Sequence, residues 1–242
     1  MAKDWGCVLQ GADFDLEDWA DCLKKPFDPW IHRNGSQFAL RSKTFDDALD
    51  AQEVRDRSVA LIDQLNGAMA ALKGSSPVSF GGVVEYAQDG KEHATIFIDA
   101  MIETRSRVKA IASTPGGQAQ APTPVECPAQ EWVRIAEQDG HLEDALDYFG
   151  RASLPVKRND PTHWFDIYKT IESLEHKYGG EKGLQSKGWV AADDLKALKT
   201  TANFSRHARR KFAPPKTPVS VQTARSLLAT IVKGAFAEEK TP

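Results

Sequence analysis

The chain has 242 residues, of which 41% are hydrophobic and 27% charged, a composition that is ordinary for soluble globular proteins and excludes bulk disorder. Its net charge is −3, from 31 basic and 34 acidic residues, so the chain as a whole is not polycationic. No run approaches about 18 consecutive apolar residues and the acidic start differs from a secretion signal, so we expect neither a membrane span nor an export sequence.

The first half of the chain predicts a small antiparallel sheet with one or two helices against it. Asn34-Gly35 separates two strand-like runs, and Asn-Gly in that position is a strong hairpin signal. Thr44, followed by two aspartates, predicts the start of a long helix with periodic apolar residues, which Gly74 ends. The expected elements in chain order are a strand at Trp5–Gln10, a helix at Leu16–Leu23, strands at Trp30–His32 and Gln37–Arg41, the helix up to Gly74, and strands from Pro77 and over His93–Met101.

The second half predicts helices. Gly179-Gly180 is a strong stop signal after a helix that carries apolar and aromatic residues on one face. Ser220 is placed to cap a final helix with a single apolar stripe that reaches Phe236. The expected helices are Gln130–Glu137, Leu142–Phe149, one from Trp164 to Tyr178, one that starts at Asp193-Asp194, and the helix after Ser220.

Composition and charge both divide the chain. Residues 113–128 are rich in Pro, Gly, Ala and Gln and lack an apolar period, which predicts a linker or an exposed loop. We therefore expect an α+β domain over residues 1–112, a linker over 113–128 and an all-α helical bundle over 129–242. Residues 1–112 carry a net charge of −5 and the remainder +2. The stretch Leu195–Ala237 contains nine basic residues and no acidic one, so its local field is positive.

The three cysteines, Cys7, Cys22 and Cys127, are far apart and lie outside any Cys-x-x-Cys pattern. Their distribution argues against a disulfide scaffold and against a zinc ribbon. We therefore expect reduced thiols that serve in packing, and a cytoplasmic protein.

The sequence lacks the glycine-rich motifs that bind nucleotides and the Gly-x-Ser-x-Gly turn of serine hydrolases. Glu172 and His176 are one helical turn apart, a spacing that can hold a metal. Only Glu175 is near as a third ligand, so a solvent-facing pair is the favoured interpretation. We expect no metal and no cofactor.

The segment Thr200–Lys211 concentrates residues suited to nucleic-acid chemistry near the end of a helix. Its cations would neutralise phosphates, its histidine can move protons at neutral pH, and Phe204 and Phe212 would stack on bases. The alternative is a solvated basic helix end in which His207 is a capping residue. The candidate binding residues are Asn203, Arg206, His207, Arg209, Arg210 and Lys211.

From about Trp164 onward the sequence resembles the HEPN superfamily, helical bundles found in prokaryotic toxins, abortive-infection systems and defence-associated proteins. The stretch Ile167–Glu172 is similar to an early helix of the family, and Asn203–His207 matches the Asn-x-x-x-His part of a later one. It is also similar to the C-terminal part of uncharacterised bacterial proteins. The resemblance implies a four- or five-helix bundle and, in the nuclease members, RNA cleavage by an arginine and a histidine that meet across a dimer. Ala202 stands where the family has that arginine, which puts cleavage in doubt.

Three functions remain open. The favoured one is a non-catalytic, HEPN-like binding or regulatory protein that associates with RNA and belongs to a bacterial defence system. The second is a metal-independent endoribonuclease in which His207 acts as acid and base, and Arg206 or Arg209 replaces the missing arginine. The third is a structural module for protein–protein interaction. The expected partners are RNA or single-stranded nucleic acid, or a protein, and the resemblance together with the last helix's apolar stripe implies a homodimer.

Overall fold

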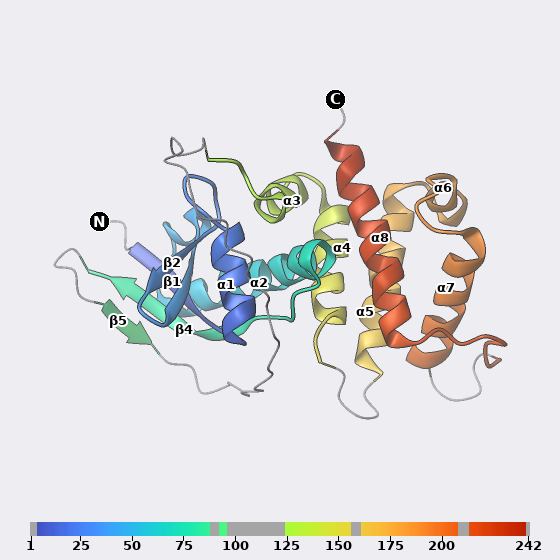
Figure 1. The fold of residues 1–242 in the computed structure, drawn as a ribbon, viewed down its shortest axis with the longest axis horizontal. Coiled ribbons are helices and arrows are strands. Elements are labelled where there is room, and N and C mark those ends of the chain that lie inside the picture. Colours follow the sequence, from blue (N-terminus) through green and yellow to red (C-terminus); the bar gives the residue numbers. More distant parts are fainter. Residues whose placement is uncertain (1–3, 88–91, 96–123, 156–160, 208–212, 241–242) are drawn as a thin grey trace, which may run out of the picture. The chain divides into compact units, whose positions relative to one another are not determined.

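The computed structural model describes residues 4–87, 92–95, 124–155, 161–207 and 213–240 (Figure 1). An antiparallel sheet occupies the N-terminal part and helices the C-terminal part, which confirms the expected α+β class. The chain divides into two compact units. Unit 1 comprises Met1–Val59 and Val78–Gln130, and unit 2 comprises Ala60–Pro77 and Glu131–Pro242. The domain boundaries expected from the sequence stay a prediction, because residues 113–123 of the predicted linker lie outside the described residues.

Unit 1 is built on a five-stranded antiparallel sheet with the strand order β2-β3-β1-β4-β5. The hairpin predicted at Asn34-Gly35 joins β2 to β3, and Gly35 takes the left-handed conformation (φ +60°) that favours glycine in this turn. The strands are β1 (Asp4–Gln10), β2 (Trp30–Asn34), β3 (Gln37–Arg41), β4 (Ser79–Tyr86) and β5 (Glu92–Thr95). The strand expected over His93–Met101 is described only as far as Thr95.

The core of unit 1 follows from the period of two along its strands. Trp5, Cys7 and Leu9 alternate in β1 and are all buried, since successive side chains of a strand point to opposite faces of the sheet. Helix α1 (Asp13–Cys22) contacts β2 and contributes Trp19, which is fully buried. The acidic first turn of α1 suits the positive end of the helix dipole.

The long helix α2 (Ala51–Lys73) begins later than the sequence predicted. Ser42 accepts a hydrogen bond from the Thr44 N–H and caps a short 3-10 helix, η1 (Lys43–Phe45), in place of the predicted first turn. The Asp50 carboxylate then accepts a hydrogen bond from the Glu53 N–H, which satisfies one of the free donors at the true helix start.

Unit 2 is helical, and α5 is its central element, in contact with α4, α6, α7 and α8. Apolar residues at helical spacing, such as Ile167, Ile171 and Leu174 in α5, are buried in this bundle. Helix α3 begins in unit 1 and continues in unit 2. The helices are α3 (Pro128–Ala136), α4 (Gly140–Ala152), α5 (Thr162–Lys177), α6 (Glu181–Ser186), α7 (Ala192–Arg206) and α8 (Val221–Glu239).

Two glycines let α2 and α4 approach closely within unit 2. A Cβ atom on Gly150 would lie 1.9 Å from the carbonyl oxygen of Asp63, and one on Gly67 would lie 2.3 Å from that of Leu146. No side chain fits at either point without moving a helix backbone. This crossing brings the helix segments around Asp63 and Gly150 together.

The apolar stripe of α8 is used within its own chain. Leu228, Ile231 and Phe236 are each at most 1% exposed, and the Phe236 ring stacks on Trp132 of α3 at a centroid distance of 4.6 Å. Ser220 caps this helix through the Thr223 N–H, as the sequence predicted. The stripe therefore offers no free face for a second copy, and the homodimer stays a prediction that rests on the resemblance alone.

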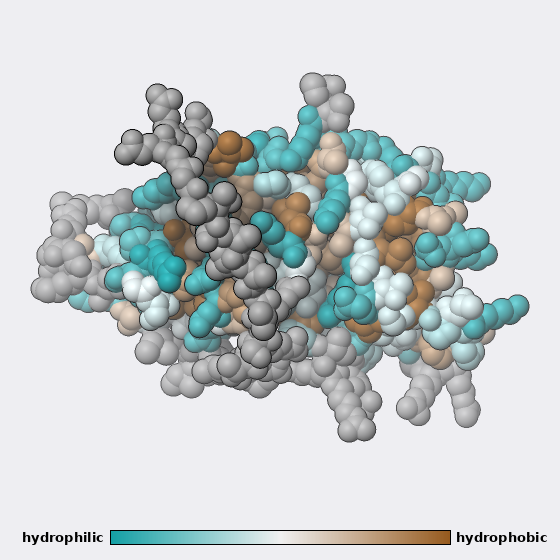
Figure 2. All heavy atoms as spheres, viewed as in Figure 1, coloured by the Kyte–Doolittle hydropathy of each residue, from teal (hydrophilic) through white to brown (hydrophobic). Residues whose placement is uncertain are grey.

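The exterior mixes hydrophilic and hydrophobic residues on the side drawn in Figure 2. Large hydrophobic side chains are exposed at separate positions, including Leu49, Phe165 and Phe204. Single exposed apolar residues of this kind are normal on a folded protein. None of the described helices is long and apolar enough to cross a membrane.

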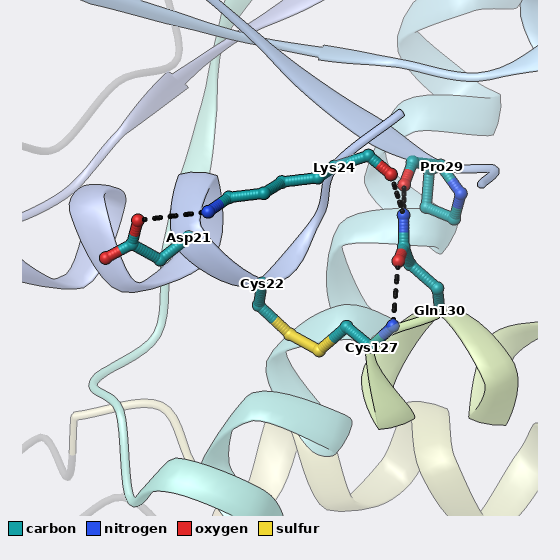
Figure 3. The surroundings of a disulfide bond; sticks show 6 residues. All are labelled: Asp21, Cys22, Lys24, Pro29, Cys127 and Gln130. Atoms are coloured by element: carbon teal, nitrogen blue, oxygen red, sulfur yellow. Dashed lines mark hydrogen bonds and ion pairs between the residues drawn. A yellow bond between two sulfur atoms is a disulfide. The ribbon is translucent and has the colours of Figure 1, made fainter. Parts of the chain in front are cut away.

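The cysteines differ from the expectation of three reduced thiols. Cys22 and Cys127 form a disulfide (Figure 3). Cys7 is free and buried. The two bonded residues are 105 positions apart in sequence, yet their Cα atoms are 5.4 Å apart. The expectation was wrong because residue spacing alone carries no sign of a contact that folding creates between the end of α1 and the chain before α3.

Candidate nucleic-acid interface

The predicted binding segment lies at the end of α7 and meets the first half of α5. The Arg206 guanidinium lies over the Tyr168 ring, with its carbon 3.5 Å from the ring centroid. Its Nε and Nη2 atoms both donate to the side-chain oxygen of Asn203, at 3.1 and 2.9 Å. A planar cation stacked on an aromatic face is a stabilising arrangement, and the amide fixes its orientation. The structure thus joins two of the predicted residues and adds Tyr168.

The α5 side of this arrangement carries a further cation and a further ring. Lys169 pairs with Glu172 at 2.5 Å, and its Nζ lies 5.9 Å from the centroid of the Phe165 ring. Hydrogen bonding to Glu172 raises the pKa of Lys169 above its ordinary value, although partial burial and the positive charge of Arg206 oppose the rise. Glu172 is thus engaged by a lysine, and His176 instead stacks on His141 at 6.0 Å.

Two phenylalanines on the same two helices are exposed. Phe165 on α5 is 43% exposed and Phe204 on α7 is 37% exposed. Phe165 is three residues from Tyr168 and four from Lys169, so these three share a face of α5, whereas Phe204 follows Asn203 directly and lies on a different side of α7 from Arg206. We call the following set the α5–α7 surface: Phe165, Tyr168, Lys169, Asn203 and Arg206.

The remaining predicted site residues fall in two groups. His207 is the C-cap residue of α7 and is partly exposed. This is the position that the alternative interpretation of the segment, a solvated basic helix end, gave it. Arg209, Arg210 and Lys211, together with Phe212, lie outside the described residues.

Several cations of the acid-free stretch Leu195–Ala237 are already occupied inside unit 2. Lys199 forms ion pairs with Glu175 and Glu181, each at 2.6 Å. Burial disfavours its charge, but the hydrogen bonds to these two carboxylates raise the pKa of Lys199 overall. Arg225 donates through Nε to the carbonyl oxygen of Ala152 at 2.7 Å, at the end of α4, where a cation suits the helix dipole. The stretch Leu195–Ala237 has no acidic residue of its own, but acidic residues elsewhere in the chain neutralise part of its positive charge. Less positive charge is therefore available to a ligand than the sequence of this stretch indicates.

A second group of charged side chains in unit 2 contains one aspartate from each of three helices: Asp63 from α2, Asp147 from α4 and Asp166 from α5. Burial, reinforced by the Asp147 carboxylate, raises the pKa of Asp63 from 3.8 to about 7, although Arg151 opposes the rise. Burial also raises the pKa of Asp147, while its ion pair with Arg151 works against it. This arrangement lets a carboxyl group hold a proton close to neutral pH.

Among the described residues, no group of three or more His, Cys, Asp or Glu side chains is placed to hold a metal ion.

No family model, curated protein or solved structure matches this chain. The HEPN-like interpretation therefore stays a prediction from the sequence patterns of the last helices.

Proposed function

We propose that this chain is a non-catalytic, HEPN-like regulatory protein that binds single-stranded RNA on the α5–α7 surface. The observation that carries the proposal is the Arg206 guanidinium, which Asn203 holds against the Tyr168 ring. Cations of fixed orientation together with exposed aromatic side chains are the combination that single-strand binding uses.

The held guanidinium is suited to a phosphate. A guanidinium has five N–H donors, and Asn203 accepts from two of its nitrogen atoms, which leaves donors for an oxyanion. Because the side chain is already fixed, binding would cost less of its rotational freedom than binding by a mobile lysine. Lys169 stands on the same surface, but its ion pair with Glu172 reduces the attraction that it would add for a second phosphate.

The exposed phenylalanines supply the second element of single-strand binding. Stacking of a base on an aromatic side chain contributes about 1–3 kcal/mol and tolerates any base. Phe165 and Phe204 are exposed enough to accept a base, and each adjoins a polar or cationic member of the α5–α7 surface. Sequence-tolerant binding of a flexible strand is therefore the expected behaviour.

The non-catalytic part of the proposal is supported by Ala202. This residue occupies the position of the arginine in the HEPN nucleases and is fully buried here. An arginine side chain at this point would put a charge into the core of unit 2, which is costly without a buried partner. The bundle is thus packed around alanine, and the phosphate-holding charge of those nucleases has no place at this position.

The test is the binding of a short fluorescent single-stranded RNA to the full chain, measured by anisotropy over a series of salt concentrations. Arg206→Ala should weaken binding about tenfold and lower the salt slope by about one. Arg206→Lys should recover only part of the loss, because lysine keeps the charge but not the planar stack. Lys233→Ala, an exposed cation of α8 in the same acid-free stretch, is the matched control and should change binding little.

Other outcomes separate the alternatives. RNA cleavage by the wild-type chain that His207→Ala abolishes would replace this proposal with an endoribonuclease. Absence of RNA binding at low salt, or equal weakening by Arg206→Ala and Lys233→Ala, would refute the α5–α7 surface as the binding site. A module for protein–protein interaction would instead bind its partner with little dependence on salt.

A further inference from the structure

The Cys22–Cys127 disulfide joins two residues of unit 1 that are 105 positions apart in sequence. Cys22 is the last residue of α1, and Cys127 directly precedes α3 (Figure 3). The bond therefore fixes the point at which the chain enters α3 to the end of the first helix. A cross-link over 105 residues removes many conformations from the unfolded chain, which stabilises the folded one.

A buried glutamine holds the same junction without covalent chemistry. Gln130 in α3 is fully buried, and its Nε2 donates to the carbonyl oxygens of Lys24 and Pro29 at 3.1 and 2.7 Å. Its Oε1 accepts a hydrogen bond from the Cys127 N–H at 3.1 Å. These hydrogen bonds do not depend on the S–S bond. The junction can therefore stay assembled when the disulfide is reduced, which distinguishes it from a disulfide that is the sole link.

The third cysteine does not take part in thiol exchange. Cys7 is fully buried in β1, and burial raises the pKa of its thiol to about 12. Only the thiolate attacks a disulfide, so Cys7 stays inert at neutral pH. The chain has three cysteines in all, and Cys22 with Cys127 is thus its single redox couple.

We propose that the Cys22–Cys127 disulfide is a redox latch, opened by a dithiol reductant and re-formed by exchange with a small-molecule disulfide that is itself reduced to thiols, and that this latch stabilises the folded chain while Gln130 keeps the junction folded. This inference concerns unit 1 and goes beyond the RNA binding proposed for unit 2. It also gives the unexpected disulfide a role that depends on the redox state of its surroundings.

The exchange balances in two steps. A thiolate of the dithiol first attacks the sulfur of Cys127, which is the more exposed residue of the pair. A mixed disulfide forms between the reductant and Cys127, and Cys22 leaves as a thiolate that takes up a proton. The second thiol of the reductant then attacks the mixed disulfide and releases Cys127. Two electrons pass to the disulfide, and the reductant is left as its own cyclic disulfide.

The latch predicts a specific pattern of thiol reactivity in the full chain. Alkylation after unfolding in denaturant, read by mass spectrometry, should label one cysteine in the oxidised protein. It should label all three after incubation of the native protein with dithiothreitol. Three labelled cysteines in protein purified in air would refute the bond, and resistance of the native disulfide to dithiothreitol would refute the latch.

Thermal melting measures what the latch does. Reduction should lower the melting temperature of the full chain by roughly 10 °C, the lower end of the effect expected for a loop of this length. Cys7→Ala should keep this response, whereas the double variant Cys22→Ser with Cys127→Ser should melt like the reduced protein and ignore the reductant. Gln130→Ala should enlarge the decrease caused by reduction. Equal melting temperatures for oxidised and reduced wild-type protein would overturn the proposal, and this comparison holds even if the double variant fails to fold.

Discussion

Replacement of Asp63 by Asn should change how the stability of the protein depends on pH. The pKa of Asp63 is raised to about 7 in the folded chain, mainly by burial and then by the Asp147 carboxylate, whereas the unfolded carboxyl keeps the value 3.8. Between these two values the folded state holds a proton that the unfolded state has released. Folding stability contributed by this group is therefore complete at acid pH and is lost as pH rises from about 4 to about 7.

The size of the effect follows from the difference between the two pKa values. A difference of one corresponds to about 1.4 kcal/mol, so the change from 3.8 to about 7 sets a ceiling of about 4 kcal/mol. Asp63 is partly exposed, and the solvent that reaches it reduces the cost of its charge. We therefore expect Asp63→Asn to be about 1–2 kcal/mol more stable than the wild type at pH 8 and nearly equal to it at pH 4.

The measurement is urea unfolding followed by circular dichroism at a series of pH values. The free energy of unfolding of the wild type minus that of Asp63→Asn should decrease through the window from pH 4 to pH 7 and stay constant above it. Asp56→Asn, a change at an exposed aspartate on the same helix, is the control for the substitution itself. A flat difference for Asp63→Asn, or one that increases with pH, would show that this carboxyl is not held protonated in the fold.

Three further predictions concern packing and assembly. Gly150→Ala should destabilise the protein by about 1–3 kcal/mol, because the new Cβ would lie 1.9 Å from the Asp63 carbonyl oxygen. The control is Gly140→Ala in the same helix, whose Cβ would meet nothing within 4 Å, so this variant should be neutral or stabilising. Chemical denaturation of this pair tests the close crossing, and equal stabilities would contradict it. Phe236→Ala should lower the free energy of unfolding by about 3–5 kcal/mol, because the ring is fully buried and stacks on Trp132. A melting temperature within a degree of the wild-type value would argue against this packing. Light scattering should give a dimer if the resemblance holds for assembly, and a single 26.7 kDa species would exclude it.

Local signals in the sequence predicted most of the secondary structure. Asn34-Gly35 forms the hairpin, Ser220 caps α8, and Gly179 takes the positive φ that ends α5. Each of these signals acts through a few neighbouring residues, so the residue types suffice to read it. The start of α2 was misplaced because Thr44 and Asp50 are both residue types that begin helices, and the choice between them depends on the surrounding chain, in which Ser42 caps a 3-10 helix over Thr44.

The candidate site was predicted only in part. Asn203 and Arg206 are one helical turn apart, so their contact could be expected once α7 was recognised. Tyr168 and Phe165 lie on another helix, and no spacing rule links them to α7. The ion pairs of Lys199 were missed for the same reason, because Glu175 and Glu181 lie on other helices. The sequence therefore counted Lys199 as a cation available to a ligand, which it is not.

The sequence by itself determined most of the helices, the hairpin and the concentration of cations and aromatics near the end of α7, but not the short helix α6. The tertiary structure alone decided that Cys22 meets Cys127, that Arg206 stacks on Tyr168 and that Asp63 holds its proton near neutral pH. The physical reason is the range of the forces involved. Caps, turns and helical periods depend on backbone groups a few residues away, whereas a covalent cross-link, a stacked cation or a raised pKa depends on which distant residues the folded chain places within a few ångströms.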